Sequence, residues 1–289
     1  MYDGLKRIRT VSALRRQVEA WRAAGERVAL VPTMGALHTG HIALVRAARR
    51  RADRVVASVF VNPAQFGPNE DFSRYPRTLP ADMAKLAAAR TDAVFTPDVA
   101  EMYPEGFCTT VSLGGPAEGL ESDFRPTHFA GVATVVAKLF TQCRPDLAFF
   151  GEKDYQQLQV VSRMARDLDL AVKVVGVPTV READGLALSS RNIYLSAEER
   201  RLAPSIYQAL AAAADQIAAG APTDVATEEA RVFLDSRGFA VDYVAARHAL
   251  TLAPIGSIAD GPVRILCAAR LGRTRLIDNV PVPPAKKNA

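Results

Sequence analysis

Cysteine is scarce in this 289-residue chain. Cys108, Cys143 and Cys267 are odd in number, lie far apart and form no CxxC pair. This spacing predicts no disulfide framework, and no histidine, cysteine and carboxylate set has the spacing of a zinc site. Because none of the cysteines lies in a cluster, catalysis by a thiol nucleophile is unsupported.

Long hydrophobic runs are also missing. No apolar stretch reaches the roughly 18 residues that a membrane span needs. The basic N-terminal residues 1–9 are not followed by the apolar stretch of a secretory signal peptide. The composition, 49% hydrophobic and 23% charged, is ordinary for a globular protein. We therefore expect a cytoplasmic protein with no membrane partner.

Two common phosphate-binding loops are absent as well. The chain has no GxxxxGK[ST] sequence, and no GxGxxG sequence follows a predicted strand. If this protein binds a nucleotide, its phosphates must be held by a site other than these two loops.

The formal net charge is +5, and one basic cluster stands out. The cluster consists of Arg46, Arg49, Arg50, Arg51 and Arg54. It falls at the predicted C-terminal end of a helix, where cations complement the helix dipole. We interpret it as a solvated turn and expect no nucleic-acid partner. A non-catalytic nucleic-acid or nucleotide-binding module remains the alternative from another class, but no contiguous basic surface is evident.

Helical and strand patterns alternate through the first part of the chain. Helices are predicted at 10–24, 41–50, 80–90, 131–143 and 154–168, and strands at 28–33, 55–61, 93–96, 147–150 and 172–177. This alternation predicts an α/β fold, a Rossmann-like parallel sheet with helices on both faces. Sites in such sheets lie at the carboxyl ends of the strands.

The pattern changes after about residue 183. Two helices are predicted at 197–219 and 223–236, followed by strands that begin near 241, 263 and 274, with a hairpin turn at 270–273. We predict a first domain over 1–183 and a smaller C-terminal α+β lid domain over 184–289, with a flexible tail at about 281–289.

The sequence His38-Thr-Gly-His41 lies between the first strand and the following helix. Two imidazoles three residues apart at a helix start can face one anion. Gly40 permits close backbone approach, and the helix N-terminus adds free N–H groups and partial positive charge. The arrangement predicts a phosphate site.

Three further polar clusters follow later strands or turns. They are Asn62 with Gln65, the run Gly151-Glu-Lys-Asp-Tyr-Gln-Gln157, and the run Ser189-Ser-Arg-Asn192. Together with the histidines they should meet at one edge of the sheet, because the carboxyl ends of parallel strands share that edge.

The chemistry of these clusters is charge stabilisation around phosphates. Lys153 and Arg191 can neutralise phosphoryl oxygens, and Ser189 and Ser190 can donate hydrogen bonds. Asp154 is either a helix N-cap or an acceptor for a ribose hydroxyl.

Neutral amides at Gln65 and Gln157 suit a hydroxy acid. His128 is interpreted as structural and His248 as a surface residue. We predict no metal ligands in the chain, with Mg²⁺ arriving on a nucleoside triphosphate.

Five motifs together resemble the pantoate–β-alanine ligase family of the HxGH nucleotidyltransferase superfamily. They are Pro32-Thr-Met-Gly-Ala-Leu-His-Thr-Gly-His41, Phe60-Val-Asn-Pro-Ala-Gln-Phe66, Tyr75-Pro-Arg-Thr78, Gly151-Glu-Lys-Asp-Tyr-Gln-Gln157 and Ser189-Ser-Arg-Asn192. The resemblance implies condensation of (R)-pantoate with β-alanine, using ATP and Mg²⁺, through a pantoyl adenylate with release of AMP and diphosphate. It also implies a cytoplasmic homodimer.

The resemblance also implies residue roles. His38, His41, Lys153 and Arg191 would be catalytic, with His41 in a proton-donor role. The implied ATP site comprises Met34, Gly35, Ala36, Leu37, His38, Thr39, Gly40, His41, Gly151, Glu152, Lys153, Asp154, Val180, Leu188, Ser189, Ser190 and Arg191. Gln65, Gln157 and Asn62 would bind pantoate and β-alanine.

Two positions depart from the common family pattern. Leu188 stands where methionine is common, which conserves volume, and Ala64 stands where a larger apolar residue is common. Neither change removes a reacting group. A different member of the superfamily, such as a pantetheine-phosphate or nicotinate adenylyltransferase, is the nearest alternative.

Overall fold

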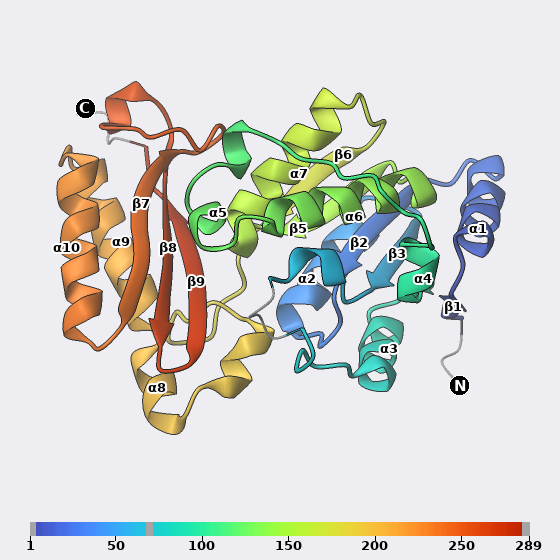
Figure 1. The fold of residues 1–289 in the computed structure, drawn as a ribbon, viewed down its shortest axis with the longest axis horizontal. Coiled ribbons are helices and arrows are strands. Elements are labelled where there is room, and N and C mark those ends of the chain that lie inside the picture. The colour runs from blue at the N-terminus through green and yellow to red at the C-terminus, as the bar shows by residue number, and fades with distance from the viewer. Residues whose placement is uncertain (1–3, 68–71, 285–289) are drawn as a thin grey trace.

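A six-stranded, fully parallel sheet forms the larger part of the computed structural model, which describes residues 4–67 and 72–284 (Figure 1). The strand order is β1-β4-β3-β2-β5-β6. The strands are β1 (Lys6–Ile8), β2 (Val28–Thr33), β3 (Arg54–Val59), β4 (Ala93–Phe95), β5 (Leu147–Gly151) and β6 (Lys173–Val177). The predicted Rossmann-like class is confirmed, but the short edge strand β1 was not anticipated.

Helices cover both faces of this sheet. The longer ones are α1 (Val11–Ala23), α2 (Thr39–Arg49), α3 (Leu79–Ala88), α6 (His128–Cys143) and α7 (Tyr155–Asp167). Alternate residues of β2 show why, since Val28 and Leu30 pack with α1, α6 and α7 while Ala29 and Val31 pack with α2 and α3. Strands buried on both faces appear as continuous apolar runs, as in the sequence. Two short helices, α4 (Val99–Met102) and α5 (Glu121–Phe124), were not predicted.

The chain changes direction across the sheet between β2 and β5. From β2 it builds outward through β3 and β4, and it then returns to place β5 on the other side of β2, followed by β6. The loops after β2 and β5 therefore run in opposite directions from the carboxyl edge. Open α/β sheets bind ligands in the crevice between such loops. The His38–His41 motif follows β2, and the Gly151–Gln157 run follows β5.

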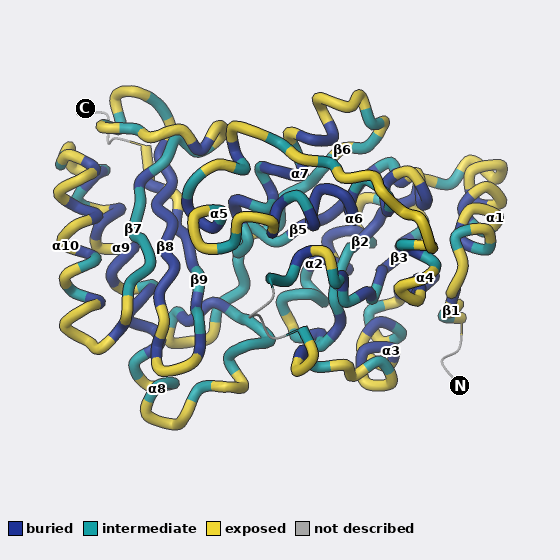
Figure 2. Tube along the Cα trace, in the orientation of Figure 1, coloured by how far each residue is buried: buried dark blue, intermediate teal, exposed yellow. Residues whose placement is uncertain are grey.

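The C-terminal part is built on an antiparallel sheet of β7 (Ala240–His248), β8 (Val263–Leu271) and β9 (Thr274–Pro281). Helices α9 (Ser205–Ala218) and α10 (Thr223–Ser236) lie side by side against it (Figure 1). The predicted hairpin is confirmed, with Leu271 paired to Thr274. Figure 2 shows that β8 is buried along most of its length.

One helix expected in this part was wrong. The predicted helix 197–219 is broken into α8 (Ala197–Leu202) and α9, because Pro204 cannot continue the first helix. The flexible tail at about 281–289 stays a prediction; at its start, Pro281 ends β9, and Val282 is buried and bonded to Val263. Residues 285–289 lie outside the described residues.

The two parts share buried surface. Leu252 and Leu266 from the C-terminal part belong to the same apolar cluster as Leu30 of the parallel sheet. The domain boundary at 183–184 stays a prediction. Within the described residues, no helix is long and apolar enough to cross a membrane.

Candidate active site

A cavity of about 840 Å³ lies where the two parts meet. Its lining comes from the carboxyl ends of β2, β3 and β5, from residues 178–180 and 186–192, and from β9 of the C-terminal sheet. All four polar clusters singled out in the sequence contribute side chains to it. The predicted meeting of these clusters at one sheet edge is therefore observed.

His38 and His41 cap helix α2 with their own rings. The Nδ1 atom of His38 accepts from the backbone N–H of Gly40 at 3.1 Å, and the Nδ1 of His41 accepts from the N–H of His38 at 3.3 Å. In each neutral ring the proton must then sit on Nε2. Because both rings line the cavity, each can offer an Nε2–H donor to a ligand.

Both imidazoles are strongly biased toward the neutral form. Burial, followed by the charge of Lys153, lowers the pKa of His38 to about 4. Burial, followed by repulsion from His38, lowers the pKa of His41 to about 3. At neutral pH the unliganded protein therefore meets an anion with two neutral hydrogen-bond donors, and the formal positive charge comes from neighbouring cations.

Asp82 of α3 holds the turn that precedes the histidines. Its carboxylate is fully buried and accepts from the backbone N–H groups of Ala36 at 3.0 Å and Leu37 at 2.8 Å, and from the hydroxyl of Thr78 at 3.2 Å. Gly35 and Ala36 both have positive φ, at 82° and 50°, so this turn needs external support. Asp82 supports the turn, and its oxygens are already bonded.

Lys153 and Asp154 follow β5 and form an ion pair at 3.5 Å. Burial raises the pKa of Asp154, but the nearby cations Lys153 and Arg191 together outweigh burial and lower it, so the carboxyl stays ionised. Asp154 occupies the N-cap position of α7, as one of the two interpretations expected, but its side chain makes no capping hydrogen bond. It lines the cavity instead.

The segment that contains Ser189, Ser190 and Arg191 covers another side of the cavity. Leu188 donates its N–H to the carbonyl of Val180 at 3.0 Å, which anchors the segment to the strand exit. Tyr75 also contacts it, with its hydroxyl 3.5 Å from that of Ser190 and its ring 5.9 Å from the Arg191 guanidinium carbon.

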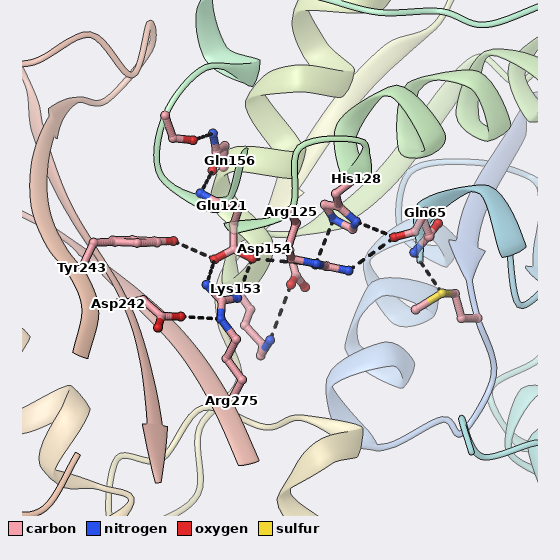
Figure 3. A network of polar contacts seen from close by, with 12 residues as sticks. Gln65, Glu121, Arg125, His128, Lys153, Asp154, Gln156, Asp242, Tyr243 and Arg275 are labelled. Atoms are coloured by element: carbon pink, nitrogen blue, oxygen red, sulfur yellow. Dashed lines mark hydrogen bonds and ion pairs between the residues drawn. The ribbon is translucent and has the colours of Figure 1, made fainter. Parts of the chain in front are cut away.

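Gln65 is buried at the inner end of the cavity, with 8% of its surface exposed. Its Nε2 lies 3.0 Å from the sulfur of Met34, as Figure 3 shows. Its backbone carbonyl accepts from Nδ1 of His128 at 3.0 Å and from Arg125 at 3.4 Å. His128, interpreted as structural from the sequence, thus helps to fix the backbone of Gln65.

A buried ionic network lies next to Gln65 and reaches the C-terminal sheet (Figure 3). Glu121 of α5 receives two hydrogen bonds from Arg275 of β9 at 2.7 and 2.8 Å, and one from the hydroxyl of Tyr243 at 2.9 Å. Arg275 also pairs with Asp242 at 2.6 Å. Burial raises the pKa of Glu121, but the Arg275 guanidinium and the other donors outweigh burial and lower it. This network joins the two parts of the fold beside the cavity.

Most of the sequence-predicted site residues line the cavity. They are Met34, His38, Gly40, His41, Asn62, Gln65, Gly151, Lys153, Asp154, Gln157, Val180, Leu188, Ser189, Ser190 and Arg191. Gly35, Ala36, Leu37, Thr39 and Glu152, although described, are not among its lining residues. Glu152 instead pairs with Arg264 at 3.1 Å.

Sequence reasoning missed several lining residues. Tyr75, Glu121, Arg125 and Arg275 belong to the cavity lining but were not proposed as site residues. Tyr75 lies in a motif that was quoted only for resemblance. Arg125 and Glu121 are near His128, which could have directed attention to that run, whereas nothing local marks Arg275.

The contacts add detail to two further interpretations. The basic cluster is not simply solvated, because Arg49 pairs with Asp92 at 2.9 Å and Arg54 pairs with Glu26 at 2.7 Å. His248 is half-buried, and its Nδ1 accepts from the backbone N–H groups that follow β7. Within the described ranges, no group of three or more His, Cys, Asp or Glu residues is arranged to hold a metal ion.

Comparison with known proteins identifies relatives over nearly the whole chain. The sequence profile described as pantoate-beta-alanine ligase matches residues 6–281. A protein named pantothenate synthetase from Rhodopseudomonas palustris (strain BisA53) is 61% identical over 275 residues, 95% of this chain and 97% of the relative. Another of that name from Bradyrhizobium sp. (strain BTAi1 / ATCC BAA-1182) is 60% identical with the same coverage.

Solved structures agree with the sequence relatives. The pantothenate synthetase of Thermus thermophilus has a TM-score of 0.89 and 51% identity, over 96% of this chain and all of that one (100%). The pantoate-beta-alanine ligase of Francisella tularensis, complexed with beta-gamma ATP and beta-alanine, has a TM-score of 0.80 and 32% identity, covering 96% of this chain and 97% of that chain.

Proposed function

The chain belongs to the pantoate–β-alanine ligase family, and on that premise we propose which residues carry each part of the reaction. The enzyme condenses (R)-pantoate with β-alanine to pantothenate through a pantoyl adenylate, and it releases AMP and diphosphate. The observation that carries the residue roles is that the four polar clusters line one cavity at the carboxyl edge of the sheet.

ATP occupies the side of the cavity formed by His38, His41, Lys153 and Arg191. The two imidazoles donate from Nε2 to phosphate oxygens, while the ammonium and guanidinium groups neutralise charge that develops on the α-phosphate and diphosphate. Ser189 and Ser190 add hydroxyl donors. The adenine lies near Val180, and Asp154 accepts from ribose, as the family resemblance implies.

Pantoate occupies the inner end beside Gln65 and Gln157. Neutral amides can hydrogen-bond a hydroxy acid without adding a charge that would compete with the phosphate-binding cations. β-Alanine enters next to Gln65. Apolar residues of α6 complete this end, including Val132, Val135 and Leu139, and they suit the branched carbon skeleton of pantoate.

The reaction needs no covalent bond to the enzyme. A carboxylate oxygen of pantoate attacks the α-phosphorus, and the bond from that phosphorus to the diphosphate breaks. The amine nitrogen of β-alanine, having lost a proton, then attacks the acyl carbon, and AMP leaves with the electrons of the C–O bond. The protein orients both attacks and stabilises the departing anions.

Water must be kept from the acyl adenylate between these steps. The C-terminal sheet supplies Arg273 and Thr274 through Asp278 to the cavity wall, so a wall of the site comes from a separate sheet. We assign to this wall the exclusion of water from the intermediate.

Mg²⁺ fits this site as an ion carried by the triphosphate. Magnesium usually binds substrate phosphates together with one or two carboxylates, and the Asp154 carboxylate lies on the phosphate side of the cavity. Asp82 is unsuited to the role because its oxygens are bonded to the backbone turn. The ion would supply neutralisation of phosphate charge.

We also infer that the enzyme is a cytoplasmic homodimer. The support is the membership in this family. Light scattering on the purified protein at several concentrations tests the dimer, and a monomer mass throughout would contradict it.

One assay tests the activity and the mechanism together. The enzyme is incubated with ATP, Mg²⁺, pantoate and β-alanine, and AMP and the amide product are measured while each component is omitted in turn. We expect AMP to form only when pantoate is present, and the amide product to form only when β-alanine is present as well. Nucleotide transfer without AMP release would indicate an adenylyltransferase instead.

A further inference from the structure

Asn62 lies next to the substrate amide Gln65 and is 1% exposed. Its Nδ2 donates to Oε1 of Gln65 and to the carbonyl of Gly131, both at 3.1 Å. Its Oδ1 accepts from the N–H of Ala64 at 3.3 Å and from the hydroxyl of Tyr103 at 2.7 Å. Both ends of this amide are therefore bonded within the protein, which leaves it little capacity to bind a substrate.

The bond from Tyr103 is the shortest of the four. Tyr103 lies just after α4, outside every motif that marks the site in the sequence. Its ring packs against Phe60 and Phe107 at centroid distances of 6.3 and 5.1 Å. Burial raises the pKa of its hydroxyl to about 12, so the group remains a donor at any pH at which the enzyme works.

We propose that Tyr103 is a positioning residue for pantoate binding. Its hydroxyl, by bonding Oδ1 of Asn62, keeps the Nδ2 of Asn62 directed at Oε1 of Gln65. Gln65 is thereby held with its Nε2–H₂ group toward the cavity.

Along the series of hydrogen bonds from Tyr103 through Asn62 to Gln65, each donor meets an acceptor in only one orientation of the two amides. If the Asn62 amide turned over, its Nδ2 would face the N–H of Ala64 and its Oδ1 would face the carbonyl of Gly131, two repulsive contacts. With Asn62 fixed, the Gln65 end that receives its donor must be the oxygen. Nε2 is then left against the Met34 sulfur, which is a weak acceptor that a substrate oxygen can replace.

The consequence concerns substrate selection. Gln65 offers a donor, so the group that it recognises must be an acceptor, a carboxylate or hydroxyl oxygen of pantoate. This inference rests on the proposed role of Gln65, and the experiment separates the two. If Gln65→Ala leaves the KM for pantoate unchanged, the proposed role of Gln65 itself is wrong, whatever Tyr103 does.

Tyr103→Phe removes only the hydroxyl and keeps the ring packing. Loss of one buried hydrogen bond of about 1 kcal/mol corresponds to roughly a five-fold change. We expect the KM for pantoate to rise about five-fold, with the KM for ATP within two-fold of the wild type. Tyr155→Phe is the matched control, because it removes a buried tyrosine hydroxyl bonded to Ala249 at 2.9 Å, away from Gln65.

A double-mutant cycle gives the decisive readout. In a Gln65→Ala background, Tyr103→Phe should change the KM for pantoate by less than two-fold, because the amide that it positions is gone. The proposal is overturned if the five-fold effect persists in that background. It is also overturned if Tyr103→Phe raises the KM values for ATP and pantoate equally, or lowers the unfolding temperature without changing the pantoate KM.

Discussion

The rings of His38 and His41 lie 4.1 Å apart between centroids, tilted by 48°, and each uses its Nδ1 to accept from the backbone at the start of α2. The pair thus caps the helix, and it is also the phosphate site that we propose. Protonation of either Nδ1 would break a cap and place a second cation beside Lys153. The geometry therefore favours hydrogen-bond donation from Nε2, rather than a resident imidazolium, in the unliganded enzyme.

This arrangement predicts the titration of the histidines. In the free enzyme, the Hε1 resonances of His38 and His41 should show no protonation step near pH 6.5, because their pKa values are about 4 and about 3. Addition of diphosphate should raise both pKa values, since an anion stabilises the charged ring. NMR of the four-histidine protein measures this, and a midpoint near 6.5 for either ring without ligand would contradict it.

The same shifts predict how stability depends on pH. Between pH 6.5 and about 3, the unfolded chain binds protons at these histidines that the folded chain does not. Their contribution to stability is therefore fully present above pH 6.5 and is lost as the pH falls through that window. Urea unfolding of the wild type and of a His38→Gln, His41→Gln variant tests this. The two proteins should differ in how steeply the free energy of unfolding changes with pH, and only within that window.

Removal of a phosphate-binding group should slow adenylate formation. We expect His41→Ala or Lys153→Ala to lower pantoate-dependent AMP formation by about 10²-fold or more, with the fold intact by circular dichroism. His248→Ala is the matched control, because that ring lies on β7 outside the cavity lining. Near-normal rates in either site variant would contradict the assigned roles.

Asp82→Ala should weaken ATP binding without touching a ligand-binding group. The substitution leaves the N–H groups of Ala36 and Leu37 without their acceptor, so the turn before His38 loses its support. We expect the KM for ATP to rise about ten-fold, as the loss of two buried hydrogen bonds implies, and the unfolding temperature to fall. An unchanged KM for ATP together with a lower unfolding temperature would limit Asp82 to a structural role.

Gly131→Ala tests the close contact between α6 and the turn after β3. Alanine in a helix interior ordinarily stabilises by roughly 1 kcal/mol relative to glycine. Here the added Cβ would overlap the backbone of Ala64 and Gln65. We expect destabilisation by about 1–3 kcal/mol, as in overpacked cores, and a higher KM for pantoate. Gly256→Ala, where the nearest atom is 3.9 Å away, should have little effect in thermal unfolding.

The buried pair of Glu121 and Arg275 should matter more than surface pairs do. Arg275→Met leaves the Glu121 carboxylate buried without its main partner, and we expect a loss of about 3–5 kcal/mol in urea unfolding. Arg231→Met, at the exposed contact with Glu228 on α10, should leave the unfolding midpoint unchanged. Equal losses in both variants would contradict this account of the network.

A feature of the fold or of the site could be predicted from the sequence when the residues that determine it lie close together in the chain. Some signals can be recognised from a few neighbouring residues. They are the apolar run at Val28–Val31, the glycine and two histidines after β2, and Lys153 beyond β5. Together they sufficed to predict the parallel sheet and the cavity edge at which these side chains meet.

Other features depend on partners distant in the sequence. The role of Asp82 arises from backbone groups 45 and 46 residues away, and that of Arg275 from Glu121, 154 residues away. No periodicity or spacing encodes such contacts. Asp154 is a related case, because it occupies the N-cap position of α7 while its carboxylate pairs with Lys153 rather than with the backbone.

The cavity also has a consequence for the order in which the enzyme is made. One part of the lining includes Met34, His38 and His41, and another runs from Arg273 through Asp278. During synthesis the ribosome delivers the first of these parts more than 200 residues before the second, an interval that follows from the numbering. A nascent chain could hold the folded parallel sheet while lacking a closed reaction chamber. If, as proposed, the residues of β9 keep water from the adenylate, the intermediate is protected only after translation has passed β9.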